Sequence, residues 1–135
     1  MAEQIARFKP GVNVPAFAAT AVLAGRFVKI TGGKTAQGDY QIGHCGAGER
    51  AFGVAERDSA AASEPAHSVE RRVNVVRPGA IARVLCGADV TAGAAVKSDA
   101  NGKAIPQGGT GTIVGYALET ADGDSGTDYV EVELV

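Results

Sequence analysis

The sequence predicts an all-β protein: a compact β-barrel or β-sandwich of two pseudo-repeated halves, preceded by an extended N-terminal arm. The first observation is composition, because 19 of the 135 residues are glycine, about twice the average share of roughly 7%. The second is that the apolar residues, 45% of the chain, are mostly Ala and Val in short runs, which favour strands over long helices. The third is an internal repeat.

The repeat pairs residues 22–29 with residues 90–97, which carry Val, Ala-Gly, Val and Lys in the same four places. An Ala-Gly pair followed by an apolar run is typical of a tight turn that enters a strand. Two later matches follow in the same order: Gly53-Val54-Ala55 with Gly115-Tyr116-Ala117, and Val73-Asn74-Val75 with Val130-Glu131-Val132. The offset shrinks from 68 to 62 to 57 residues, so the first copy has the longer loops.

Residues 1–21 are expected to form the arm, and residues 22–135 a single β domain with pseudo-repeats at about 22–77 and 80–135. Pro10 and Pro15 interrupt any periodicity in the arm, since proline restricts its own backbone and that of the preceding residue. Its apolar residues follow no helical spacing: Ile5, Phe8, Val12, Val14 and Phe17. Such an arm is either a disordered leader or a segment that becomes ordered along a partner.

In the first half, strands are expected near residues 27–30 and 40–42, separated by a glycine turn, and then at 51–55. A loop of small and polar residues over 58–65 follows. Residues 69–77 alternate apolar and polar side chains, as a half-buried strand does.

In the second half, residues 80–86 alternate in the same way, and the Ala92-Gly93 turn leads into the next strand. Asn101-Gly102 predicts a hairpin, because both residues accept the positive φ of a type I′ turn. Strands at 112–118 and 129–135 close the half, with an acidic loop between them. The total is nine or ten strands.

Composition and charge exclude several function classes. The net charge is −2 and the Lys and Arg residues are scattered, whereas nucleic-acid binding requires a basic cluster. No apolar stretch is long enough to span a bilayer, and the N-terminus lacks the apolar core of a signal peptide. We therefore expect a soluble cytoplasmic product with no nucleic-acid or membrane partner, in which Cys45 and Cys86 are reduced thiols.

The sequence contains no pattern of residues that indicates catalysis, a metal or a cofactor. His44 and Cys45 are adjacent, so in a strand they point to opposite faces. The loop from Asp122 to Asp128 has glycine in the fifth place, whereas a calcium-binding EF-hand loop requires it in the sixth. No nucleophile elbow or phosphate-binding loop is present. We therefore predict a protein that is not an enzyme.

The chain resembles the capsid cement, or decoration, proteins of tailed bacteriophages. The resemblance covers nearly all 135 residues, and it is carried by the following segments: Phe8-Lys9-Pro10-Gly11, Val22–Val28, Gly53-Val54-Ala55, Val90–Lys97, Asn101-Gly102-Lys103, Gly115-Tyr116-Ala117 and Val130-Glu131-Val132. It is a pattern of turns and strands, and no single motif is diagnostic.

The resemblance implies a structural protein of the virion that is made in the host cytoplasm. It implies binding to the outer surface of the head, where a homotrimer clamps neighbouring major capsid protein subunits and stabilises the expanded shell. The residues expected to contact the capsid are those of the arm: Ile5, Phe8, Val12, Val14 and Phe17 as apolar anchors, with Arg7 and Lys9 as charge contacts. The alternative is a cellular β-barrel module that binds a small molecule or serves as an accessory domain of a larger enzyme.

Overall fold

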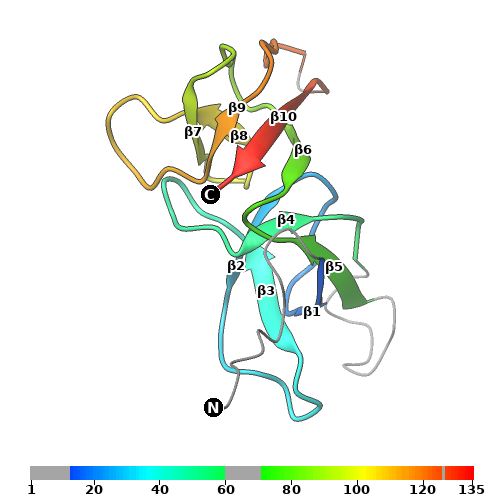
Figure 1. Ribbon diagram of the computed structural model, residues 1–135. Coiled ribbons are helices and arrows are strands. Elements are labelled where there is room, and N and C mark those ends of the chain that lie inside the picture. Colours follow the sequence, from blue (N-terminus) through cyan, green and yellow to red (C-terminus); the bar gives the residue numbers. More distant parts are fainter. Residues whose placement is uncertain (1–12, 60–70, 126) are drawn as a thin grey trace, which may run out of the picture.

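The computed structural model describes residues 13–59, 71–125 and 127–135 and is all-β, as predicted. Five strands form a closed barrel in the order β1-β3-β2-β4-β5, and five more form a second sheet in the order β6-β10-β9-β7-β8. The second sheet lies above the barrel in Figure 1. The strands are β1 (Val14–Ala18), β2 (Phe27–Ile30), β3 (Tyr40–His44), β4 (Gly53–Ala55), β5 (Arg72–Val76), β6 (Ile81–Leu85), β7 (Ala95–Ser98), β8 (Ala104–Pro106), β9 (Gly115–Ala117) and β10 (Tyr129–Leu134).

Strand β1 closes the barrel, and this differs from the expectation that residues up to 21 belong to the arm. It pairs in parallel with β3, from Ala16 opposite Tyr40, and antiparallel with β5, from Val14 opposite Val75. Pro15 argued against a strand, but it precedes the parallel pairing with β3, at a strand end where proline is tolerated. The alternate side chains Val14, Ala16 and Ala18 are buried. Pairing on both sides and burial therefore make residues 14–18 part of the domain.

The second half repeats the strand order of the first. Read the other way round from β1, the closed barrel has the order β1-β5-β4-β2-β3. Replacing each strand by the one five numbers later gives β6-β10-β9-β7-β8, which is the order of the second sheet. The repeated turns also match: Gly25 has φ 71° and donates its N–H to the carbonyl of Ala55 at 2.9 Å, while Gly93 has φ 84° and donates to Ala117 at 2.7 Å. The sequence repeat is therefore a repeat of backbone hydrogen bonds as well as of residue types.

The halves differ in how they close. Among the described residues, the strands corresponding to β1 and β3 in the second half, β6 and β8, are joined by a single parallel bridge between Cys86 and Ala104. A segment of the first half contacts both sides of this opening. The Leu85 N–H donates to the carbonyl of Gly25 at 2.9 Å, and the Phe27 N–H donates to the carbonyl of Gly102 at 2.7 Å.

Phe27 links the two halves. It is 0% exposed and packs in the core of the second half, although it begins a strand of the barrel. The barrel interior has its own small apolar core, formed by Ala16, Ala18, Val22, Val28, Ile42, Ala55, Val73 and Val75. The two cores meet across β2 and β4, and the halves are therefore interlocked rather than merely adjacent.

The remaining strands lie where the sequence predicts them, except at their ends. The Asn-Gly pair correctly predicts the hairpin between β7 and β8, and Gly102 has φ 77°. The type I′ turn is wrong, because no described residue other than glycine has positive φ. The Asp99 carboxylate instead accepts the N–H groups of Asn101 and Lys103 and holds a wider loop. The strand expected at 69–77 is β5, at 72–76, while residues 60–70, which include most of the loop expected at 58–65, lie outside the described part. Within the described ranges, no helix has the length and apolar character needed to cross a bilayer.

Candidate functional site

The residues expected to bind a capsid fall into two groups. Ile5, Arg7, Phe8, Lys9 and Val12 lie outside the described residues. Val14 and Phe17 lie in β1, where they are 1% and 6% exposed. The Arg71 guanidinium lies over the Phe17 ring, 4.2 Å from its centroid. In the chain by itself these two side chains are therefore part of the barrel and present no free surface to a partner.

The base of the arm is held rigidly. β1 pairs with a strand on each side, and the Asn13 side-chain amide donates to the Glu56 carboxylate at 2.9 Å. A force applied to residues before Asn13 would therefore pass directly into the barrel sheet.

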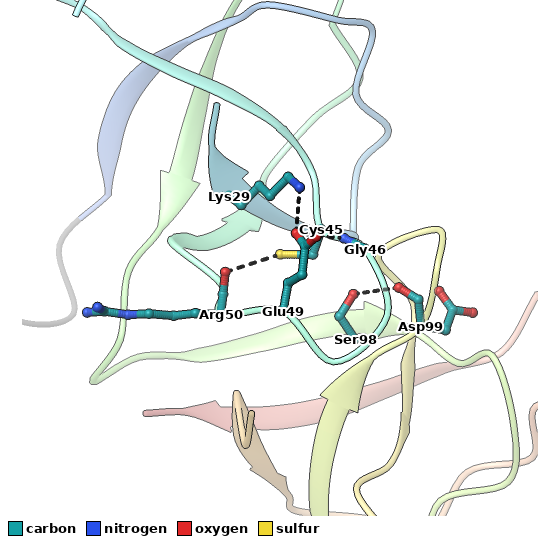
Figure 2. A network of polar contacts seen from close by, with 7 residues as sticks. All are labelled: Lys29, Cys45, Gly46, Glu49, Arg50, Ser98 and Asp99. Atoms are coloured by element: carbon teal, nitrogen blue, oxygen red, sulfur yellow. Dashed lines mark hydrogen bonds and ion pairs between the residues drawn. The ribbon is translucent and has the colours of Figure 1, made fainter. Parts of the chain in front are cut away.

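A cationic groove of about 410 Å³ lies beside β2, where the segment between β3 and β4 meets the end of β5. Its lining residues are Lys29, Ile30, Glu49, Arg50, Ala51, Phe52 and Arg77. The one acid in this lining is paired: the Glu49 carboxylate lies 2.5 Å from the Lys29 ammonium and accepts the Gly46 N–H. These two hydrogen bonds, that to Lys29 first, lower the pKa of Glu49. Figure 2 shows this network, with the Arg50 side chain extending away from it.

Two arginines of the groove, Arg50 and Arg77, have no acidic partner in the part of the chain that the structure describes. Arg77 stacks on the Phe52 ring at 4.0 Å from its centroid and donates to the Phe52 carbonyl. Burial, and then the positive charge of Arg50, lower the pKa of Arg77. Within the described ranges, neither Arg50 nor Arg77 forms an ion pair. Because Ile30 is 44% exposed beside them, the groove combines positive charge with apolar surface and suits a carboxylate-bearing partner.

A second surface lies on the outer side of β6 and β10. Ile81 is 61% exposed there, and the Arg83 guanidinium lies 5.2 Å from the centroid of the Tyr129 ring. Two hollows of about 310 and 400 Å³ share Arg83 and Tyr129, and the second hollow is lined by Glu119, Asp122 and Asp128. We call the surface formed by Ile81, Arg83, Tyr129, Glu119, Asp122 and Asp128 the aromatic–acidic face.

Cys45, Cys86 and His44 lie in environments that suit a structural role. The Cys45 S–H donates to the Arg50 carbonyl at 3.6 Å, and burial raises its pKa to about 12. Burial also raises the pKa of Cys86. The His44 Nε2 accepts the Leu23 N–H at 2.9 Å. A thiolate nucleophile requires a lowered pKa, so neither cysteine lies in an environment that activates a thiol for nucleophilic attack.

The structure also brings together residues that the sequence analysis did not connect. Arg50 and Arg77 are 27 positions apart and meet because β4 pairs with both β2 and β5. Asp89 lies with Asp122 and Asp124, with carboxylate atoms within 4.8 Å of one another, all three exposed. The charge of Asp122 raises the pKa of Asp124. Asp122 and Asp124 belong to the acidic loop that the sequence shows, but nothing local indicates that Asp89 joins them or that Arg50 meets Arg77, since both depend on long-range contacts.

Comparison with known proteins finds a matching family model and similar solved structures. The family model described as phage cement protein matches residues 6–134. Among solved structures, the N base of the head fiber gp8.5 of bacteriophage phi29 is 22% identical, with a TM-score of 0.69, and the match covers 92% of this chain and 93% of that one. This structural similarity supports the fold. No curated protein matches the chain.

Proposed function

The chain belongs to the phage cement protein family, and from this premise we propose that it binds the outside of a phage head and clamps neighbouring major capsid protein subunits. Family membership makes the protein an accessory component of a phage capsid. The finer statement, that it stabilises the expanded shell by bridging subunits on the outer surface, is our proposal. The family match over residues 6–134 is the observation that carries it.

The physical basis of the proposal is added interface at the seams of the shell. A bridge of standard size removes on the order of 1,600 Å² of surface from water. Many identical bridges act together, because each subunit that one copy holds is already close to the next copy. Even a modest affinity per contact therefore resists the outward load of packaged DNA.

We propose that the arm makes the bridge and that β1 anchors it. Ile5, Phe8 and Val12 supply apolar contacts, and Arg7 and Lys9 supply charge contacts. Val14 and Phe17 act from the barrel side, since their burial fixes the strand from which the arm leaves. Because β1 pairs with a strand on each side, it unfolds less readily under load than a strand that pairs on one side only.

The test is attachment to phage heads that lack the protein. Deletion of residues 1–12 keeps β1 intact, whereas a deletion through Ala19 would remove a barrel strand. We expect the deletion variant to keep the circular dichroism spectrum of the intact chain but to lose sedimentation with heads and protection of heads against heat. The control is the point variant Gln4→Ala, which should attach normally. Full attachment by the deletion variant would refute the role of the arm, and failure of the intact chain to attach to any head would refute the proposed function.

We also propose that the protein acts as a homotrimer. Small apolar side chains give each half a thin core, and association would add buried surface. Mass measurement of the purified chain, free and attached to heads, tests the number of copies.

A further inference from the structure

The two halves of the chain carry opposite charge. Residues 1–77 contain ten Lys and Arg against seven Asp and Glu, a net charge of +3, whereas residues 78–135 contain three against eight, a net charge of −5. The whole chain is nearly neutral because these values offset each other. A molecule with one positive and one negative end attracts its own copies in a head-to-tail orientation.

Each half also has a surface on which this charge can act. In the first half, the cationic groove presents Arg50 and Arg77 without an acidic partner among the described residues, beside the apolar surface of Ile30 and Phe52. In the second half, the aromatic–acidic face presents Ile81 and Tyr129 beside three carboxylates and one cation, Arg83, which lies over the Tyr129 ring. Tyr and Arg are enriched at protein interfaces, where a polar rim surrounds a more apolar centre.

The two surfaces share no residue, so a contact at one does not use a side chain that the other needs. This is the requirement for a heterologous contact, in which each copy is a donor on one side and an acceptor on the other. A contact between two copies of the same surface would instead place like charges together. Arg50 would face Arg50 across a groove-to-groove contact, and the carboxylates would face each other across the second surface.

We propose that the cationic groove of one copy receives the aromatic–acidic face of the next copy. Carboxylates such as that of Asp128 then face Arg50 and Arg77, while Tyr129 and Ile81 cover Ile30 and Phe52. A chain of such contacts closes into a ring when the rotation between copies allows it. The inference rests on the self-association proposed above and adds to it the two surfaces and their chemistry.

The test is a charge swap within one chain, read out as oligomer mass by light scattering and as dissociation constant by analytical ultracentrifugation. Arg50→Glu and Asp128→Arg are suitable, because both residues are exposed and neither side chain forms a hydrogen bond with another described residue. Each single variant should weaken self-association at least ~10-fold at low salt, since like charges then meet at the contact. The double variant, with both changes, should restore it, because every groove then meets a face of opposite sign.

The control is Lys34→Glu, which changes net charge by the same amount as Arg50→Glu but lies outside both surfaces. It should associate as the unmodified chain does, and high salt should weaken the unmodified chain and the double variant alike. Circular dichroism melting checks that all variants are folded.

Any one of four outcomes would overturn the inference. If both single variants keep the original mass and affinity, the surfaces are not the contact. If the double variant is no better than the single variants, the groove and the face do not meet each other. If Arg50→Glu leaves the mass unchanged but abolishes attachment to heads, the groove binds the capsid protein instead, and the proposed function survives without this contact. A chain that stays monomeric both free and on heads would refute the self-association as well.

Discussion

Phe27→Ala tests the interlocking of the two halves. The side chain is 0% exposed and packs in the core of the second half, while its backbone joins β2 of the barrel. Truncating a fully buried Phe to Ala costs about 3–5 kcal/mol, because the transfer free energy of the ring is lost and a cavity remains. Since native domains are stable by only about 5–15 kcal/mol, this single change should remove a large part of the free energy of unfolding.

The assay is urea unfolding followed by circular dichroism, combined with hydrogen exchange of individual backbone amides. We expect the midpoint to fall sharply, and the amides of Val96 and Val130 in the second half to lose at least as much protection as that of Val75 in the barrel. The control is Ile30→Ala on the same strand, whose side chain is 44% exposed and should cost less than ~1.5 kcal/mol. The reasoning is refuted if both variants cost the same, or if only barrel amides lose protection.

Three further predictions follow from close contacts and from pKa directions. Gly53→Ala should be strongly destabilising by thermal melting, because a Cβ there would lie 2.2 Å from the Val76 carbonyl oxygen, whereas Gly33→Ala, with open space around it, should be nearly neutral; equal melting points would contradict this. Burial, and then the charge of Arg26, lower the pKa of His44 below 6.5. The unfolded state therefore binds the proton more readily, so stability is full above about pH 6.5 and falls as the pH drops toward the folded-state pKa. The urea midpoint should decline over this range and decline less in His44→Gln, and a parallel decline in both proteins would count against the assignment. Cys45 and Cys86, both buried with raised pKa values, should react with a maleimide slowly when folded and rapidly in urea; prompt labelling of the folded chain would be the contrary result.

The fold class could be predicted because its signals are local. Alternating Val and polar residues set the faces of β5 and β10, and Asn101-Gly102 sets a hairpin. The repeated Ala-Gly turns indicate the internal duplication, since the equivalent positive-φ glycine makes the equivalent hydrogen bond in each half. A strand, a turn and its repeat are each encoded within a few residues, so the sequence by itself determined the elements other than β1 and the relation between the halves.

The tertiary structure decided which elements meet. Nothing near Val14 indicates that β1 pairs with β3 and β5, because those partners lie 24 or more positions away. The same holds for Phe27, which fills the core of the other half, and for Arg50 and Arg77, which become one groove only when β4 joins their strands. Local patterns fix which face of a strand is apolar, but strand order, register and closure are settled by the mutual packing of the whole chain. The surfaces proposed to bind partners form only through that packing. For this reason the sequence predicts the fold class more fully than it predicts those surfaces.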